Sequence, residues 1–594
     1  MKAIRHLPRA LICALALTAL AAPAADAAIP PAYAEGERPS FVVIQTDDQT
    51  LDSLYAAHRT PFSTQETRAM PNTLDLLGKR GMTFNRYYVP YPLCCPSRVS
   101  LLTGRYSHNN NVRGNNPPNG GYIGFSFRAA ATNNIATWLQ GSGYRTVHVG
   151  KVMNGYGQAP FSTGLEVPPG WEAWYGVVNE DQTHYYYGYR LNANGTILPP
   201  FGDSGDWETR EYGVRDDPGC PTAPLNGLPC NHVTDKLTEI AVNEMVATSP
   251  EQPFYVQLDF TAPHGDFRRP AGPEPAPRHY DWFKGARLPH DYSEGLNEGN
   301  VSDKPRFIRD APYLTPFERR VYRVYWQKQL DSLRSVDDGV KRVIDTLGYL
   351  GRLRNTYVVF TSDNGFFFGE HRLLGGKFLA YEPATHLPFL IRGPGIKPGT
   401  ETGELAANID IAPTLLDLAG VEPTKSVDGR SLVPFLEDPE LRTRRPILFE
   451  SFVETNDVEA DGEIPTTDRP NTAGASNGPV ASASLLAPPK DYAGIRLGPW
   501  KYIAWPSGEK EMYNINRDPN ELNSLHRVPN FFPIRNFLHR EMTRLIDCVG
   551  RECQEVSPPF PLTRIEALRL RAEKRKEQRE KEKEREQRRK ERDQ

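Results

Sequence analysis

The chain has 594 residues, which is too long for one small core and predicts two domains with terminal tails. Its formal net charge is −3, so its composition argues against a nucleic-acid partner. After the first residues no stretch has the length of apolar sequence that crosses a membrane, so we expect no transmembrane anchor.

The N-terminus has the three parts of a secretory signal peptide. Basic residues precede an apolar run over 11–22, and the small-residue sequence Ala25-Asp26-Ala27 follows it. We therefore expect residues 1–27 to be removed on export. The mature protein is then secreted, periplasmic or held at the cell surface.

Residues 38–440 alternate between strand-like and helix-like segments, which predicts an α/β domain with a mostly parallel sheet flanked by helices. In chain order the patterns predict a buried strand at 41–44, helices at 71–79 and 134–139, one long helix or two in series over 315–347, and buried strands at 355–361 and 387–391.

Residues 445–560 have a different pattern, in which short strands are joined by turns. The segment 493–502 is typical of a strand, a tight turn and a second strand, and 511–515 of a third strand. We expect a smaller antiparallel α+β domain here, with a mobile loop at 464–489, where Pro, Ser, Thr, Ala and Asn predominate.

The tail over 564–594 is nearly all Glu, Lys, Arg and Gln, which predicts a solvated charged helix or a disordered segment. Because basic residues outnumber acidic ones there, contact with an anionic surface polymer is the alternative interpretation.

Four cysteines lie outside the signal peptide and the Cys94-Cys95 pair, and they fall into two pairs that are close in sequence. These are Cys220 with Cys230, and Cys548 with Cys553. In an exported protein such spacing predicts two short-loop disulfides. A zinc site is the alternative, although no histidine lies at finger-like spacing near either pair.

The most specific pattern in the chain begins at Cys94 and reads C-x-P-S-R-x-x-x-L-T-G-R. Pro96 suits the first turn of a helix and Gly104 suits its end. Cys94 would then lie at a helix N-terminus, where unpaired N–H groups favour anions. Arg98, one turn further on, is in reach of a carboxylate or a bound anion, whereas Cys95 fills the free position and is expected to pack in the core.

Polar residues follow the predicted strands at their carboxyl ends, where functional groups gather in open parallel sheets. They are Asp47 and Asp48, Lys151, His264, and Asp363 with Asn364. The two aspartate-containing pairs offer oxygen ligands, which favours Ca²⁺ or Mg²⁺ over zinc. Clustered carboxylates would repel one another without a cation. Each pair alone is also typical of a turn.

The Cys94 pattern resembles the signature of type I sulfatases, in which the cysteine is oxidised to formylglycine after translation. Other blocks resemble sulfatase sequences in sulfatase order: Thr46-Asp47-Asp48-Gln49, Ala262-Pro263-His264, Thr361-Ser362-Asp363-Asn364-Gly365 and Gly376-Lys377. The double cysteine and Gly150-Lys151-x-x-Asn154-x-Tyr156 are most similar to the N-acetylglucosamine-6-sulfatase branch and related arylsulfatases. The resemblance implies an alkaline-phosphatase-like fold with a smaller C-terminal domain.

The resemblance also implies a role for each candidate residue. Formylglycine would form at Cys94 by the action of a formylglycine-generating enzyme, and Arg98 would stabilise its hydrate. Ca²⁺, or Mg²⁺ in its place, would bind Asp47, Asp48, residue 94, Asp363 and Asn364. Sulfate would bind Lys151, His264 and Lys377, which would also assist the leaving group.

One departure from the family pattern concerns the base of the second half-reaction. Many sulfatases carry a histidine two residues after the lysine that matches Lys151, and this chain has Met153 there. The glucosamine-6-sulfatase branch also lacks that histidine, so activity is not excluded. His108 is a candidate for the unassigned base.

These observations predict an exported, calcium-dependent sulfatase that acts on a sugar sulfate such as N-acetylglucosamine 6-sulfate, or on an aryl sulfate. One alternative is a phosphodiesterase or phosphonate monoester hydrolase of the same superfamily. Another is a non-catalytic protein that binds sulfated glycans. The aromatic clusters at 171–175 and 184–187 are candidates for a sugar pocket or for the core, and His148, inside a predicted strand, is expected to be structural.

Overall fold

The computed structural model describes residues 38–59, 66–178, 184–202, 231–266, 272–291, 293–452 and 491–592. Within these residues, ten strands form one sheet in the order β13-β4-β12-β11-β1-β10-β6-β7-β8-β9. Its centre is parallel and consists of β11 (Thr356–Ser362), β1 (Ser40–Thr46), β10 (Phe254–Asp259), β6 (Arg145–Gly150) and β7 (Ala173–Val178). The flanking strands, mostly antiparallel, are β13 (Thr400–Thr402), β4 (Met82–Phe84), β12 (Phe389–Arg392), β8 (Arg190–Ala193) and β9 (Thr196–Ile197). The predicted α/β architecture is confirmed.

β1 lies in the middle of this sheet because it is apolar on both faces. Val42 and Ile44 pack into one apolar cluster, and Phe41 and Val43 pack into another. Alternate side chains of a strand point to opposite faces, so the run supplies both layers of core. Continuous apolar runs of this kind are typical of parallel strands covered by helices on both sides.

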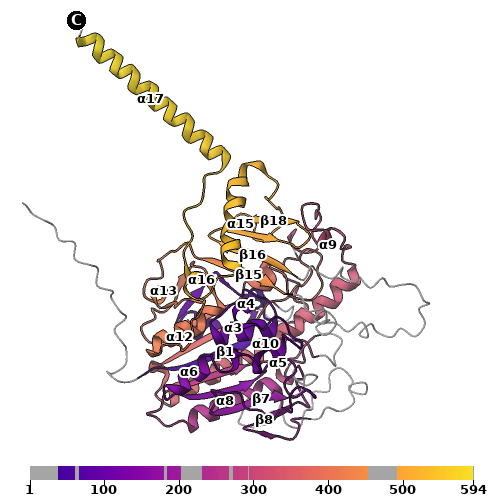
Figure 1. The fold of residues 1–594 in the computed structure, drawn as a ribbon. Coiled ribbons are helices and arrows are strands. Elements are labelled where there is room, and N and C mark those ends of the chain that lie inside the picture. Colours follow the sequence, from indigo (N-terminus) through magenta and orange to yellow (C-terminus); the bar gives the residue numbers. More distant parts are fainter. Residues whose placement is uncertain are drawn as a thin grey trace, which may run out of the picture.

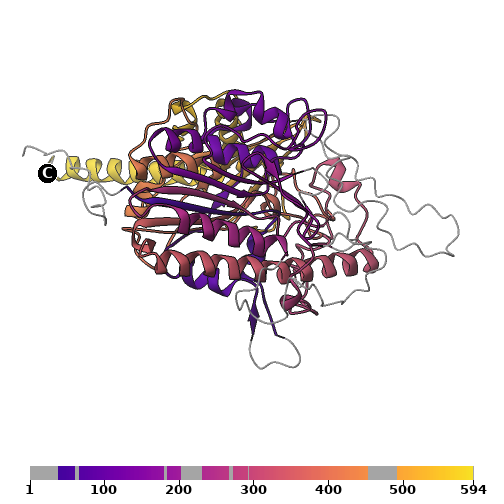
Figure 2. The same cartoon turned by 90° about the horizontal axis from the view of Figure 1, so that it is seen from below.

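Helices cover both faces of the sheet (Figure 2). On one face lie α8 (Val233–Ala247) and α10 (Pro316–Tyr349), which share an apolar cluster with Val42 and Ile44. On the other face lie α3 (Cys94–Thr103), α6 (Ile135–Gly141) and α12 (Ile411–Ala419). The shorter helices are α1 (Leu51–Tyr55), α2 (Pro71–Thr73), α4 (Ser107–Asn110), α5 (Gly121–Ser126), α9 (Arg306–Arg309), α11 (Glu382–Thr385), α13 (Val433–Glu437) and α16 (Arg551–Gln554).

The segment predicted as one long helix or two is the single helix α10. Thr315 caps it by accepting a hydrogen bond from the Glu318 N–H, and the Glu318 carboxylate accepts one from the Thr315 N–H. The other two predicted helices are α6 and α2, the latter continuing as a π-helical turn over Leu74–Gly78.

A second sheet contains the described strands β15 (Pro446–Ser451), β16 (Tyr492–Leu497), β17 (Trp500–Ala504) and β18 (Lys510–Asn514), all antiparallel. Helix α15 (Phe532–Ile546) packs on it (Figure 1). One apolar cluster joins side chains of this sheet, such as Ile447 and Tyr502, to Tyr88 and Phe367 of the larger part. The predicted small antiparallel sheet is therefore confirmed, and it rests on the larger part through a shared core.

The C-terminal helix α17 (Arg564–Arg592) projects away from the rest of the molecule (Figure 1). Thr563 caps it: its hydroxyl accepts a hydrogen bond from the Glu566 N–H, and Glu566 accepts one from the Thr563 N–H. No helix in the described part of the chain has the length and apolarity to cross a membrane. The predicted signal peptide and the segment 464–489 lie outside the described residues.

Of the four cysteines predicted to pair, Cys548 and Cys553 form a disulfide with an S–S distance of 2.08 Å. Cys220 and Cys230 lie outside the described residues. The loop that the disulfide closes lies beside α4, because the Cys548 carbonyl accepts a hydrogen bond from the Asn109 side chain.

Candidate active site

Helix α3 places Cys94 at its first position. Leu93 before it is extended, and Gly104 after the helix has a φ of 66°, a left-handed conformation that glycine adopts without a Cβ penalty. The predicted helix is thus present with its expected ends. Cys94 Sγ lies 3.1 Å from the Lys377 ammonium and 3.6 Å from Asp47 Oδ1, so the thiol faces a charged cluster and not the apolar core.

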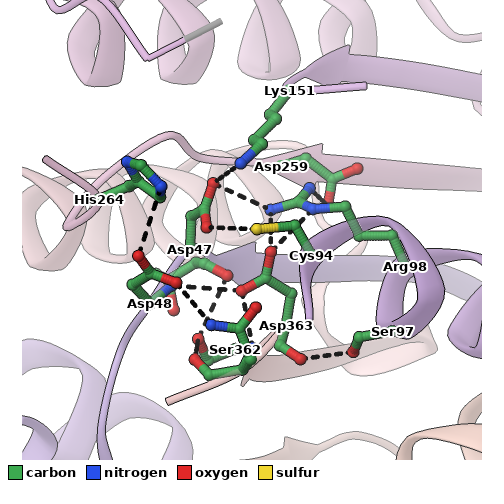
Figure 3. A network of polar contacts seen from close by, with 12 residues as sticks. Asp47, Asp48, Cys94, Ser97, Arg98, Lys151, Asp259, His264, Ser362 and Asp363 are labelled. Atoms are coloured by element: carbon green, nitrogen blue, oxygen red, sulfur yellow. Dashed lines mark hydrogen bonds and ion pairs between the residues drawn. The ribbon is translucent and has the colours of Figure 1, made fainter. Parts of the chain in front are cut away.

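The carboxyl ends of β1 and β11 deliver four oxygen-bearing side chains to this cluster. Because the strands are hydrogen-bonded neighbours, Asp47 and Asp48 leave the sheet beside Asp363 (Figure 3), and Asn364 follows Asp363 in the chain. The Asp48 N–H donates to Asp363 Oδ1 at 3.2 Å, and the Asn364 amide donates to Asp48 Oδ1 at 2.5 Å. All four residues are fully buried.

Cationic side chains surround these carboxylates. Arg98 Nη2 lies 2.8 Å from Asp363 Oδ2, and Lys377 Nζ lies 2.6 Å from Asp48 Oδ1. Lys151 forms an ion pair with Asp47. The predicted strand-end residues and the Cys94 motif therefore meet in one buried cluster. Its nine members are Asp47, Asp48, Cys94, Arg98, Lys151, His264, Asp363, Asn364 and Lys377.

The charges of the cluster shift the pKa values of its members. Burial favours the neutral form of Asp47, but the positive charges of Lys151, Arg98 and Lys377, together with His264, outweigh it and hold the pKa of Asp47 well below its usual range. Burial and the neighbouring Asp47 charge raise the pKa of Asp363 to about 7, even with Arg98 beside it. Burial likewise raises the pKa of the Cys94 thiol, which favours the uncharged form. Without a bound cation, the ionised form of the third carboxyl group, that of Asp363, is therefore unfavourable.

The oxygen atoms of the cluster fit a hard divalent cation. Among the residues that the structure describes, Asn364 Oδ1 is buried without a hydrogen-bond partner, and Asp48 Oδ2 is buried with no hydrogen bond and only the longer 3.4 Å contact to His264 Nε2. One carboxylate oxygen each from Asp47 and Asp48 and the sulfur of Cys94 lie within 4.8 Å of one another. Buried polar atoms without partners are costly, and a cation bound by carboxylate and amide oxygens would satisfy them.

Two residues of the site were missed by the sequence analysis as functional candidates. His184 Nε2 lies 3.0 Å from Lys151 Nζ, although the pattern placed His184 only in an aromatic cluster. Asp259 Oδ1 lies 3.6 Å from Arg98 Nη1. Asp259 is the last residue of β10, so the strand-end rule that found Asp47 and Asp48 also applies to it.

His148 has the structural position expected of it. It lies inside β6, its Nε2 is 3.1 Å from Asp259 Oδ2, and its ring stacks on Trp174 at 4.2 Å between centroids.

Trp171 and Trp174 are buried in the core and line a cavity of about 20 Å³, together with Arg98 and Met153. A space of this size holds one water and no sugar ring, so the core interpretation of the tryptophans is favoured over a sugar pocket.

The structure corrects the proposal of His108 as a base. Its Nδ1 lies 2.7 Å from Glu450 Oε2, and its Nε2 lies 2.9 Å from the Cys548 carbonyl oxygen. Both ring nitrogens are thus engaged in joining α4 to β15 and the disulfide loop. Burial alone would lower the pKa of His108, but the hydrogen bond and the charge of Glu450 outweigh it and raise the pKa to about 9.

This pair predicts a pH dependence of stability. Because the pKa of His108 in the folded protein is raised from 6.5 to about 9, its stabilising effect is complete below about pH 6.5 and is lost as the pH rises through about 9. His108→Gln should flatten this decline in the free energy of unfolding, measured by urea denaturation across that range, without changing turnover. An unchanged slope in the variant would contradict the assignment.

Comparison with known proteins identifies the family. A sulfatase family model matches residues 39–421. The N-acetylglucosamine-6-sulfatase of Homo sapiens is 31% identical over 541 residues, which cover 87% of this chain and 86% of that protein. The arylsulfatase of Volvox carteri is 30% identical over 573 residues, covering 91% and 78%.

A solved structure of a protein in complex with its substrate, D-glucosamine-2-N,6-O-disulfate, has the same fold, with a TM-score of 0.60 at 22% identity over 85% of this chain and 97% of that one. The fold is thus alkaline-phosphatase-like, as expected. With the family model and the two relatives, the chain belongs to the sulfatase family and is a sulfuric ester hydrolase.

Proposed function

We propose that the enzyme hydrolyses a sulfate ester on a sugar, such as N-acetylglucosamine 6-sulfate, or on an aryl group, through formylglycine at position 94 and a bound calcium ion. The observation that carries the proposal is the buried cluster in which Cys94 Sγ lies 3.1 Å from Lys377 Nζ and 3.6 Å from Asp47 Oδ1. The similarity of the chain to the human N-acetylglucosamine-6-sulfatase, over most of both chains, supports a glucosamine sulfate as the substrate.

Formylglycine fits the position of Cys94. The residue begins α3, where N–H groups without helical partners favour an anion, and cations flank the side chain. When formed, its hydrate supplies an oxygen nucleophile toward sulfur. Arg98, held by Asp363 and Asp259, lies one helical turn further on and would stabilise that hydrate. We propose a formylglycine-generating enzyme as the partner that modifies Cys94.

We assign the metal site to Asp47, Asp48, Asp363 and Asn364, with residue 94 as a further ligand. The buried oxygens of Asp48 and Asn364 that lack hydrogen bonds support this set. Calcium is favoured by the all-oxygen side chains from the two strand ends, and magnesium is the alternative. When bound, the cation supplies polarisation of a sulfate oxygen.

The remaining residues handle the charge and the proton of the leaving group. Lys151 and Lys377 are buried ammonium groups that pair with Asp47 and Asp48, and they would neutralise the sulfuryl oxygens. His264 Nδ1 lies 2.9 Å from the Gly265 carbonyl oxygen, which fixes the proton on Nδ1 and turns Nε2 toward Asp48. In its imidazolium form His264 carries a second proton, on Nε2 beside Asp48, and we assign that proton to the leaving oxygen, which leaves the ring neutral with its proton on Nδ1.

The remaining assignments concern the chain outside the site. We propose that residues 1–27 are a signal peptide that directs the protein to the periplasm, the cell surface or the medium. We also propose 38–440 as the catalytic domain, 445–560 as the smaller domain and 564–594 as a charged tail. The pairing of Cys220 with Cys230 stays a prediction.

The proposed function is tested by assaying the purified, matured protein on three substrate classes: N-acetylglucosamine 6-sulfate, an aryl sulfate, and an aryl phosphonate monoester or phosphodiester. Sulfate release, abolished in Cys94→Ala, is the expected result. Faster turnover of the phosphorus esters would establish the alternative activity of the superfamily. Binding of sulfated sugar with no turnover of any ester would establish the non-catalytic alternative.

A further inference from the structure

His184 reaches the active-site cluster from the segment between β7 and β8, outside every motif that led to the site. Its side chain is buried, with 1% of the residue exposed. Nε2 of His184 lies 3.0 Å from Nζ of Lys151, and its ring stacks on that of His264, with the centroids 4.0 Å apart and the planes inclined by 28°. The stacking defines the plane of the imidazole, and the short contact with Lys151 defines which nitrogen faces the ammonium.

The partner of Nε2 determines the protonation state of His184. An ammonium group has three N–H donors and no acceptor, so Nε2 must accept the hydrogen bond and the ring proton must be on Nδ1. Burial and the neighbouring His264 and Lys151 charges hold the pKa of His184 well below its usual value, which agrees with a neutral ring. His184 is therefore an acceptor for Lys151 and not a further cation.

Lys151 is then held by two acceptors on different segments of the chain. One N–H is directed to Asp47 at the end of β1, and a second to His184. Two fixed donors determine the direction of the third, because the geometry of an ammonium is tetrahedral. With Asp47 alone, the ammonium would be free to rotate about that single contact.

The residue two positions after Lys151 does not supply this contact. Met153 is buried in the apolar cluster that contains Val152 and Trp174. A thioether in that environment is a weak acceptor and packs as a hydrophobic side chain. The imidazole beside Lys151 thus comes from His184, on a separate segment.

We propose that His184 is a positioning residue: as a neutral acceptor it orients the Lys151 ammonium so that its remaining N–H points to a sulfate oxygen. This inference rests on the proposed function, because Lys151 is assigned there as a sulfate ligand. It adds His184, a hydrogen-bond acceptor outside the motif positions, to the residues that orient the proposed sulfate-binding groups.

The test compares two substitutions of similar size. His184→Gln keeps an acceptor for Lys151, whereas His184→Leu removes it. A hydrogen bond to a charged group contributes about 1.5–3 kcal/mol, equivalent to roughly 10- to 100-fold in affinity. We expect His184→Leu to lower kcat/KM by a factor in this range, and His184→Gln to restore most of the loss.

A second readout does not depend on turnover. The Kd for inorganic sulfate is measured by titration calorimetry in the Cys94→Ala protein, where no formylglycine forms. The same measurement is made after His184→Leu or His184→Gln is added to this parent. The leucine variant should bind sulfate about 10-fold more weakly, and the glutamine variant should bind close to the parent. His232→Gln is the matched control, because His232 is also buried but its Nε2 lies 3.0 Å from the Glu274 carbonyl oxygen, and its ring packs against Tyr186 and Tyr187.

The outcomes separate this inference from the proposed function. If the parent hydrolyses sulfate esters and His184→Leu matches it in kcat/KM and in sulfate Kd, the positioning role is wrong and the function stands. If the parent hydrolyses no sulfate ester, the function is wrong, whatever His184 does to sulfate binding. If His184→Gln and His184→Leu lose the same factor in kcat/KM and in sulfate affinity, at equal melting temperatures, the acceptor role is wrong.

Discussion

Replacing Cys94 with alanine is expected to lower the turnover of a sulfate ester by ~10⁴-fold or more, which is the scale of loss when a nucleophile is removed. The melting temperature should change by no more than about 2 °C, because the substitution removes one buried sulfur and leaves the polar cluster in place. Turnover and thermal unfolding measured on the same preparation check both parts.

Cys95 provides the matched control for this substitution. It is the adjacent residue of α3 and equally buried, but it belongs to an apolar cluster that contains Val99 and Val152. Its N–H donates to Asn115 Oδ1, and its sulfur accepts from the Asn154 N–H. Cys95→Ser should retain most of the activity. Near-normal hydrolysis by Cys94→Ala would end the nucleophile assignment.

Asp363→Asn is expected to weaken calcium binding by about 100-fold and to lower activity in parallel at a fixed calcium concentration. Asp363 contributes one of three carboxylates in the cluster and also pairs with Arg98 at 2.8 Å. Asparagine keeps the shape and an acceptor but removes the charge. In the wild type, calcium at a hundredfold excess over Kd should raise the free energy of unfolding by about 2.7 kcal/mol.

The sign of the stability change distinguishes a metal ligand from a simple structural aspartate. Without a divalent cation, Asp363→Asn should be at least as stable as the wild type at neutral pH, because it removes a carboxylate that burial and Asp47 disfavour. With calcium, the wild type should gain far more stability than Asp363→Asn. Asp337→Asn is the control, since that buried carboxylate accepts hydrogen bonds from Asn72 and Thr73 in another part of the molecule. If a chelator leaves both the activity and the stability of the wild type unchanged, the metal assignment is wrong.

The sequence was informative where local chemistry decides position. An apolar run on both faces predicts a central parallel strand, and β1 follows that rule. Polar residues directly after such strands lie at one edge of the sheet, which brought Asp47 and Asp363 together from positions more than three hundred residues apart. Pro96 and Gly104 predicted the limits of α3.

What the sequence did not show depends on contacts between segments that carry no pattern. His184 lies in a run of aromatic residues, and its contact with Lys151 arises only from the tertiary packing of its segment against the site. His108 was the opposite case, a histidine close to the motif in sequence whose ring is engaged by Glu450 and the Cys548 carbonyl. Proximity in sequence to a nucleophile is therefore weaker evidence than position at a strand end.

The most direct test of the account is mass spectrometry of the proteolytic peptide that contains residue 94, from protein purified from its native host. The account predicts the mass of formylglycine at position 94 and an unmodified cysteine at position 95 in the same peptide. An unmodified cysteine at position 94 in fully matured protein would contradict the catalytic proposal and favour a protein that binds sulfated glycans without hydrolysing them.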